Sequence, residues 1–276
     1  MNRVALPDGS TVPALGQGTW KLGERGADRA AEARVLRLGL DLGLTLIDTA
    51  EMYAEGGAEE VVAEAIAGRR EEVFLVSKVY PHNASRQGLP RALEASLRRL
   101  RTEALDLYLL HWRGGVPLAE TVEALERAVA QGKILRWGVS NLDVGDLEEL
   151  GPALSACATD QVLYNLAARG VEFDLLPYAA RLKMPVMAYS PVGQGGDLLA
   201  DRTLARIAAR QGASPAQIAL AWTLRNEGVI SIPKASTEAH LRENAEVWKI
   251  VLTPEDLAEL DTAFPPPRRK QPLAML

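Results

Sequence analysis

Four polar side chains of complementary chemistry follow apolar runs in the chain, and we call them the tetrad: Asp48, Tyr53, Lys78 and His111. A tyrosine hydroxyl titrates near about pH 10, so it exchanges protons at neutral pH only beside a cation that favours its phenolate. Lys78 can supply this cation, and Asp48 as its counter-ion would keep the ammonium charged. A neutral His111 can donate a hydrogen bond to a carbonyl oxygen that gains negative charge. The combination predicts a site for carbonyl reduction.

Reduction of a carbonyl needs a hydride donor. No side chain provides one, so the sequence also predicts a bound nicotinamide cofactor. Further polar residues close later apolar runs at equivalent places: Ser140, Asn141, Gln161, Asn165, Tyr189, Ser190 and Lys234. Each residue alone has an ordinary explanation, such as a turn cap or a solvated lysine. Their joint occurrence at successive strand ends favours a functional site.

The elements that would position these residues are short apolar runs that alternate with amphipathic stretches of helical length, as in successive βα units. Runs such as Leu107–Leu110 and Val73–Val76 are almost entirely apolar, as strands buried on both faces require. The expected strands are Leu15–Trp20, Thr45–Thr49, Val73–Val79, Leu105–Trp112, Leu135–Ser140, Thr159–Tyr164, Val186–Ser190 and Val229–Pro233. We therefore predict one α/β domain over residues 1–276, a (β/α)8 TIM barrel with its active site at the C-terminal ends of the strands.

The two ends of the chain have their own patterns. Val4–Leu6, the turn Pro7–Gly9 and Thr11–Pro13 predict a β-hairpin that closes the bottom of the barrel. The proline-rich stretch Phe264–Lys270 cannot be helical, and we expect it to run as an extended strap over the surface.

Capping residues predict several helix boundaries. Ser214, Thr237 and Thr253 carry hydroxyls before helix-compatible stretches and should begin helices. Gly132 and Gly228 are predicted to end two others, because glycine readily adopts the left-handed conformation that follows a last helical turn.

Composition excludes several classes of protein. With 31 basic and 36 acidic residues among 276, the formal net charge is −5, which argues against a nucleic-acid-binding protein. The single cysteine, Cys157, excludes an internal disulfide framework, and the three histidines match no zinc-binding spacing, so no metal is expected. No apolar run approaches the roughly 18 residues that span a bilayer, and Met1–Leu15 does not contain the apolar stretch of a signal peptide. We expect a cytoplasmic protein without a membrane or nucleic-acid partner and, by default, a monomer.

Seven segments in sequential order resemble motifs of the aldo-keto reductases: Ile47–Tyr53, Val76–Val79, Leu109–Trp112, Gly138–Asn141, Gln161–Asn165, Ala188–Pro191 and Ile232–Lys234. The resemblance covers essentially the whole chain and implies a barrel that binds NADPH without a Rossmann domain. Gly16-Gln17-Gly18 agrees with this, because no complete G-x-G-x-x-G motif follows it. The resemblance also implies that Tyr53 is the general acid and that the rest of the tetrad is catalytic. Glu51–Glu60 and Phe264–Leu276 resemble the bacterial branch that includes methylglyoxal reductases, which implies 2-oxoaldehyde substrates.

The same resemblance implies how the cofactor lies. Tyr189 would stack under the nicotinamide, Ser140 with Asn141 and Gln161 would hold its carboxamide, and Lys234 would face the 2′-phosphate. The full expected set of cofactor-binding residues is Gly18, Thr19, Trp20, Asp48, Ser140, Asn141, Gln161, Tyr189, Ser190, Pro191, Val192, Gly193, Lys234, Ala235, Ser236, Thr237, His240, Glu243 and Asn244.

Two positions depart from the commonest family pattern. Ala235 stands where a serine is frequent, and His240 stands where an arginine usually grips the 2′-phosphate. A histidine is a weaker and pH-dependent partner for an anion than a bidentate arginine. We therefore expect NADPH to be preferred, with NADH also usable.

Position in the chain also suggests the residues that face the substrate, namely Trp20, Tyr53, Tyr80, His82, His111 and Trp112. They would form an apolar, aromatic mouth suited to small aldehydes and ketones. The loop Trp112–Pro117 is short for the family, which implies an open site.

Two other functions remain open at this point. Lys78 could form a Schiff base, which would make the protein a lyase on the same barrel, although a salt-bridged ammonium is a poor nucleophile. Alternatively, the chain could be a cofactor-binding regulatory module with little turnover, because a fold and a bound cofactor do not guarantee catalysis.

Overall fold

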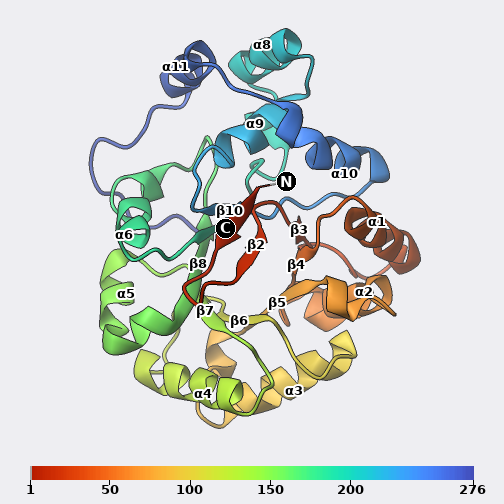
Figure 1. Cartoon of the computed structure of the whole chain (residues 1–276), viewed down its shortest axis with the longest axis vertical. Coiled ribbons are helices and arrows are strands. Elements are labelled where there is room, and N and C mark those ends of the chain that lie inside the picture. Colours follow the sequence, from red (N-terminus) through yellow and green to blue (C-terminus); the bar gives the residue numbers. More distant parts are fainter. Residues whose placement is uncertain (1) are drawn as a thin grey trace.

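Eight parallel strands surrounded by helices form a ring in the computed structural model, which describes residues 2–276 (Figure 1). In sheet order, which is also chain order, the strands are β3 (Gln17–Gly18), β4 (Leu46–Asp48), β5 (Phe74–Val79), β6 (Leu107–Leu110), β7 (Trp137–Ser140), β8 (Cys157–Leu163), β9 (Val186–Tyr189) and β10 (Val229–Ser231). Each neighbouring pair is parallel. The predicted eight-stranded barrel is confirmed.

The ring closes between the first and last strands. Leu15 forms a parallel bridge with Ser231. The Gly16 N–H donates to the carbonyl of Ser231 at 2.9 Å, and the Gly18 N–H donates to the carbonyl of Pro233 at 3.0 Å. A Cβ atom at Gly18 would lie only 2.6 Å from the Ile232 carbonyl oxygen, so the closure requires glycine at this position.

The strands differ from the expected ranges mainly at their ends. Leu15–Trp20 is reduced to Gln17–Gly18, because the chain turns away from the barrel at Trp20. Leu135–Ser140 begins at Trp137, since Leu135 is exposed and does not join the core. The strand expected at Thr159 begins earlier, at Cys157.

The helices form the outer layer (Figure 1). They are α1 (Arg29–Asp41), α2 (Gly57–Ala65), α3 (Gly88–Leu100), α4 (Leu118–Ala130), α5 (Val144–Glu149), α6 (Leu175–Arg181), α7 (Gly196–Leu199), α8 (Arg202–Gln211), α9 (Pro215–Thr223), α10 (Glu238–Ala245) and α11 (Pro254–Ala263). The helix starts expected at Ser214, Thr237 and Thr253 are confirmed. The end expected at Gly228 is wrong, because α9 stops earlier, at Thr223, and a turn at Arg225 and Asn226 leads into β10.

Alternation along each strand divides the apolar residues into two layers. On β4, Ile47 packs outward against the helices, while Leu46 packs into the barrel interior. On β5, Leu75 points outward and Val76 inward in the same way. Side chains two residues further along share a face, so Asp48 and Lys78 follow Leu46 and Val76 on the inner face. The barrel interior is thus apolar below and polar at the C-terminal ends of the strands.

The N-terminal hairpin closes the apolar end. Strands β1 (Arg3–Ala5) and β2 (Thr11–Pro13) are antiparallel. Val4, Leu6 and Val12 are buried in the same inner cluster as residues at the starts of the barrel strands. The hairpin therefore seals the end of the barrel opposite the polar strand ends.

No helix within residues 2–276 is both long enough and apolar enough to cross a membrane. In the same range, no group of three or more His, Cys, Asp or Glu side chains could hold a metal ion.

Candidate active site

The tetrad comes together at the C-terminal ends of β4, β5 and β6. The Lys78 Nζ atom lies 2.8 Å from Asp48 Oδ2 and donates a hydrogen bond to Tyr53 Oη at 3.1 Å. It also donates to the carbonyl oxygen of Thr49 at 2.9 Å. The His111 ring stands edge-on to the Tyr53 ring, with 5.7 Å between ring centres. One buried ammonium therefore bridges a carboxylate and a tyrosine hydroxyl.

Tyr53 reaches this position from the loop after β4 through unusual backbone geometry. It opens a short 3-10 turn in which Ala54 and Glu55 adopt positive φ angles of 50° and 54°. Such left-handed conformations cost about 1–2 kcal/mol for a non-glycine residue, so the surrounding structure must hold them. The turn directs the Tyr53 hydroxyl back toward Lys78.

Burial controls the protonation of the tetrad. It works to lower the pKa of the Lys78 ammonium, but Asp48 and the Tyr53 hydroxyl outweigh it, so the pKa rises above its usual value. Burial raises the pKa of the Tyr53 hydroxyl, and Lys78 offsets only part of this rise. Lys78 thus favours the phenolate as predicted, but burial outweighs this effect and the pKa of Tyr53 stays above its usual value. Tyr53 keeps its proton and can give it away.

His111 is held neutral. Burial, together with the nearby Lys78 charge, lowers the pKa of His111 to about 2. The Nδ1 atom is buried and has no hydrogen-bond partner among residues 2–276. A neutral imidazole beside Tyr53 can direct one N–H toward an oxygen without adding a positive charge to the site.

The ends of β7, β8 and β9 add a polar network next to the tetrad. The Gln161 amide donates to Asp48 Oδ1 at 2.8 Å, so both carboxylate oxygens of Asp48 have a partner. Asn141 donates to the carbonyl oxygen of His111 at 3.1 Å and accepts from Tyr189 Oη at 3.0 Å. Ser140 Oγ donates to the Gln161 carbonyl at 2.7 Å. The three residues expected to hold a carboxamide thus lie together beside the tetrad.

A cavity of about 640 Å³ extends from the tetrad to one side of α10. Of the residues expected to bind a cofactor, those that line it are Gly18, Thr19, Trp20, Asp48, Tyr189, Ser190, Pro191, Val192, Lys234, Ser236, His240, Glu243 and Asn244. Ser140, Asn141 and Gln161 line a smaller adjoining cavity.

Three expected cofactor residues lie outside these cavities. Gly193 packs against Leu198, Ala235 is buried in an apolar cluster, and the Thr237 side chain caps α10 by accepting from the His240 N–H. Sequence reasoning missed other residues that line the large cavity, namely Lys21, Gln194, Gly195, Leu199, Ser214, Pro215, Ala216, Ile232 and Pro233. The run Gln194-Gly195-Gly196 between a strand end and a helix was a signal for part of this set.

Two tryptophan rings lie next to the tetrad, and two further aromatic rings lie beyond them. Trp20 lies 5.9 Å from Tyr53, and Trp112 lies 4.8 Å from His111, measured between ring centres. Both tryptophans line the smaller cavity. Tyr80 and His82 stack on each other behind Trp112 and do not line either cavity.

The smaller cavity has two further lining residues that sequence reasoning missed, Met275 and Leu276. The proline-rich strap expected after Phe264 is confirmed as non-helical. Its continuation does more than cover the surface, since it ends beside Tyr53 and His111.

Comparison with known proteins agrees with this geometry. A sequence model of the aldo/keto reductase family matches residues 14–264. The chain belongs to the aldo/keto reductase family. It is 54% identical over 272 residues to methylglyoxal reductase YeaE of Escherichia coli, and the match covers 96% of each chain. It is 34% identical to a glyoxal reductase of Bacillus subtilis, covering 94% of this chain and 91% of the relative.

A solved structure supports the fold of this aldo/keto reductase. The aldo-keto reductase from Klebsiella pneumoniae, crystallised in complex with NADPH, is 52% identical and superimposes with a TM-score of 0.97. The match covers 100% of this chain and 99% of the Klebsiella chain. The (β/α)8 barrel deduced from the sequence is therefore the fold of this reductase.

Proposed function

We propose that this aldo/keto reductase uses NADPH to reduce the aldehyde group of small 2-oxoaldehydes, such as methylglyoxal, to an alcohol. The observation that carries the proposal is the position of Lys78 Nζ, 2.8 Å from Asp48 and 3.1 Å from the Tyr53 hydroxyl, at the end of a long cavity. This arrangement provides a proton donor where a carbonyl oxygen can approach.

The large cavity suits NADPH. The Lys234 ammonium donates to Ser236 Oγ and has no carboxylate partner among residues 2–276, so a cation remains available for a phosphate group. His240 lines the same end of the cavity, while Tyr189 lies at the other end, beside the tetrad. The NADPH complex of the Klebsiella enzyme supports the same cofactor. The methylglyoxal reductase and glyoxal reductase relatives support a 2-oxoaldehyde substrate.

The cofactor, when bound, supplies the hydride that no side chain can supply. The Tyr53 hydroxyl donates its proton to the carbonyl oxygen as the alcohol forms. The Lys78 ammonium stabilises the phenolate left on Tyr53, and Asp48 holds that ammonium in place. The neutral His111 ring donates a hydrogen bond to the substrate oxygen, which positions the carbonyl.

The smaller cavity suits a small substrate. It has a volume of about 60 Å³ and is lined by Trp20, Trp112 and the tetrad members Tyr53 and His111. Flat apolar walls of this kind accept a compact aldehyde and exclude water from the reacting groups.

A lyase that forms a Schiff base on Lys78 is disfavoured. The Lys78 ammonium is wholly buried and paired with Asp48, and its raised pKa keeps it charged. A charged ammonium has no lone pair with which to attack a carbonyl.

The deciding experiment is to follow the absorbance of NADPH, and separately of NADH, with methylglyoxal and a panel of aliphatic and aromatic aldehydes. We expect NADPH consumption, with methylglyoxal among the better substrates. NADPH binding without consumption across the whole panel would contradict the proposal and favour a regulatory module.

A further inference from the structure

The segment of residues 265–276 forms part of the active-site wall although it has no helix or strand. Met275 and Leu276 line the smaller cavity together with Tyr53, His111 and Tyr189. Both side chains remain largely exposed, as expected at the rim of a cavity. A wall without secondary structure must be fixed by contacts made elsewhere along the segment.

The middle of the segment lies on the loop between β8 and α6. Gln271–Ala274 line a crevice whose other side includes Gly170 and Val171. Lys270 Nζ lies 2.9 Å from Asp143 Oδ2 and 3.0 Å from Asp174 Oδ2. Lys270 is half exposed, and exposed ion pairs contribute little to stability. These contacts position the middle of the segment, but they do not fix the point where the segment leaves α11.

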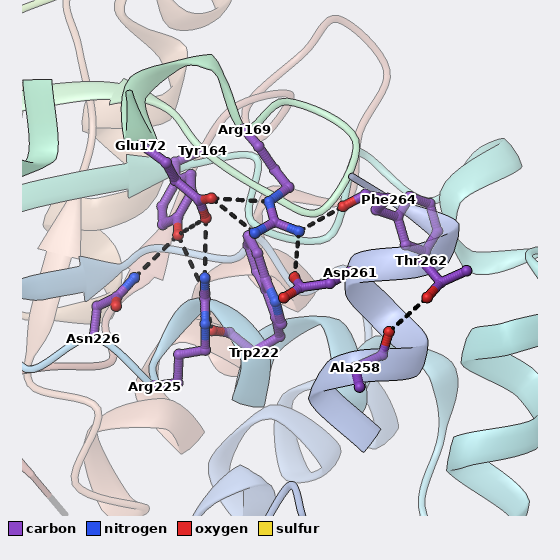
Figure 2. Close-up of polar contacts among 10 residues, drawn as sticks. All are labelled: Tyr164, Arg169, Glu172, Trp222, Arg225, Asn226, Ala258, Asp261, Thr262 and Phe264. Carbon is purple, nitrogen blue, oxygen red and sulfur yellow. Dashed lines mark hydrogen bonds and ion pairs between the residues drawn. The ribbon is translucent and has the colours of Figure 1, made fainter. Parts of the chain in front are cut away.

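Arg169, on the same loop, holds the point where the segment leaves α11 (Figure 2). Its side chain is only 7% exposed. One guanidinium nitrogen donates both to the backbone carbonyl of Phe264, the residue that caps α11, and to Asp261 Oδ1 at 2.7 Å. The other two nitrogens donate to Glu172 Oε2 at 2.8 and 3.0 Å. The guanidinium therefore bonds the loop, the helix and the carbonyl of Phe264, which directly precedes the segment.

A second layer keeps Arg169 from moving (Figure 2). The guanidinium carbon of Arg169 lies 5.0 Å from the ring centre of Trp222, and that of Arg225 lies 3.7 Å from it. Arg225 also pairs with Glu172 at 2.9 Å, and Tyr164 Oη donates to the same carboxylate at 2.7 Å. Two arginines thus face two carboxylates, Glu172 and Asp261, so the charges of the cluster balance.

The loop that carries Arg169 is also bonded to the cofactor side of the site. Asn165 Nδ2 donates to the carbonyl oxygen of Ser190 at 2.8 Å, and Ser190 lines both cavities. Ser190 has a positive φ of 48°, so its conformation depends on such support. One loop therefore connects the end of β9 with the origin of the C-terminal segment.

We propose that Arg169 is a positioning residue for substrate selection, which fixes residues 265–276 so that Met275 and Leu276 form one wall of the carbonyl site. The proposal rests on the proposed function, because the selection is between aldehydes that this reductase would reduce. Arg169 does not touch the substrate and acts only through the segment. Its planar fork serves three acceptors in different directions, which the single ammonium of a lysine cannot reproduce.

Arg169→Lys tests the proposal because it keeps the charge and removes the fork. We expect the ratio of kcat/KM for methylglyoxal over 4-nitrobenzaldehyde to change at least about fivefold, mainly through KM, and in the same direction as in Leu276→Ala. Combining the two substitutions should give less than the sum of their effects, since both act on one wall. The matched control is Arg206→Ala, which removes an exposed arginine paired with Glu259 on α11 and should leave the ratio unchanged.

Hydrogen exchange supplies a readout that needs no turnover. In Arg169→Lys the amides of residues 265–276 should exchange faster, while those of the barrel strands should keep the wild-type rate. If none of the aldehydes supports NADPH oxidation by the wild-type protein, the proposed function fails. Hydrogen exchange then still decides whether Arg169 fixes the segment.

Two results would overturn the role of Arg169. One is unchanged exchange of residues 265–276 in folded Arg169→Lys. The other is a loss of kcat/KM in Arg169→Lys that is equal for both aldehydes, while Leu276→Ala does change the ratio of the two kcat/KM values. If Arg169→Lys does not fold, Asp261→Ala removes one acceptor of the guanidinium, and unchanged exchange in that variant would refute the proposal equally.

Discussion

Lys78 makes its three contacts with one ammonium group, and this fixes what each neighbour can do. Asp48 keeps the ammonium charged, so Lys78 cannot act as a nucleophile and instead stabilises negative charge on Tyr53. Because burial keeps Tyr53 protonated, the stabilisation becomes important only as the proton leaves. The chemistry of the site depends on which of these groups gives up its proton.

Tyr53→Phe should lower kcat for methylglyoxal reduction by about 10²- to 10⁴-fold, the usual contribution of a general acid. NADPH affinity should stay within about twofold, because the substitution removes a proton donor and keeps the ring. Stopped-flow absorbance measures the rate, and quenching of tryptophan fluorescence measures binding. Tyr178→Phe, on α6 away from the cavities, is the control. Undiminished turnover by Tyr53→Phe would refute the mechanism.

His240→Arg should increase the preference for NADPH over NADH about tenfold, because an arginine fork forms two charge-assisted hydrogen bonds to a phosphate. His240 lines the end of the cavity that also contains Lys234, so the new side chain would reach the same group. Titration calorimetry with each cofactor measures the two affinities. If both change by the same factor, His240 does not contact the 2′-phosphate.

The buried carboxyl of Asp160 on β8 should make the free energy of unfolding depend on pH. Its carboxyl is wholly buried, and one oxygen has no partner among residues 2–276. Burial raises the pKa of Asp160 well above 3.8. Above about pH 4 the unfolded chain loses a proton that the folded protein keeps, so this group makes stability fall as pH rises toward the raised pKa.

Asp160→Asn should remove this dependence, a difference in slope of about 1.4 kcal/mol per pH unit at most. Urea unfolding of both proteins between about pH 4.5 and about pH 6.5 measures it. His111, with its pKa lowered to about 2, contributes a slope of opposite sign. The contribution of His111 is the same in both proteins and cancels in the comparison. Parallel pH profiles would show that Asp160 is ionised in the folded protein.

At the scale of elements, helix starts contribute to both stability and binding. Ser214 forms a capping box with Gln217 at the start of α9 and also donates to Glu243 Oε2 at 3.1 Å. Thr253 forms the same kind of box at the start of α11. Only Ser214 lines the large cavity. Substitutions of Ser214 and of Thr253 therefore separate the effect of a lost helix cap on stability from the effect of a lost cavity contact on binding.

Ser214→Ala and Thr253→Ala should each lower the free energy of unfolding by about 1 kcal/mol. NADPH should bind several-fold more weakly to Ser214→Ala alone, because Glu243 loses the hydroxyl that orients it in the cavity. Urea unfolding and fluorescence titration measure the two quantities. An equal loss of affinity in both variants would show that the effect is one of stability.

Elements with strong local patterns could be predicted from the sequence, and those set by distant contacts could not. Leu107–Leu110 could be predicted as a buried strand because the run is short and almost entirely apolar, and Thr253-Pro254 begins a helix through its own capping chemistry. By contrast, the bridge that closes the barrel joins Leu15 to the distant Ser231, and the hydrogen bond between Arg169 and Phe264 joins positions 95 residues apart. No local pattern encodes such a pairing, so the position of residues 265–276 in the site emerged only from the structure.

Across the whole molecule, the residues that close the core of the barrel and the residues of the tetrad lie at opposite ends of the barrel. The hairpin residues Val4, Leu6 and Val12 fill the apolar end, and the tetrad lies at the other. Substitutions at the closed end should therefore change folding without changing the reaction. This separation permits a test in which activity and stability move independently.

Leu6→Ala should lower the free energy of unfolding by about 2–5 kcal/mol, because it leaves a cavity in a packed cluster. The melting temperature should fall by several degrees, while kcat/KM at 25 °C should stay within about twofold, because the inner layer formed by Leu46, Val76 and Leu109 separates Leu6 from the tetrad. Leu135→Ala is the control, since Leu135 is 53% exposed and its loss should change stability by no more than about 0.5 kcal/mol. A large loss of kcat in Leu6→Ala with an unchanged melting temperature would mean that the hairpin communicates with the site, and the two ends of the barrel would then not be independent.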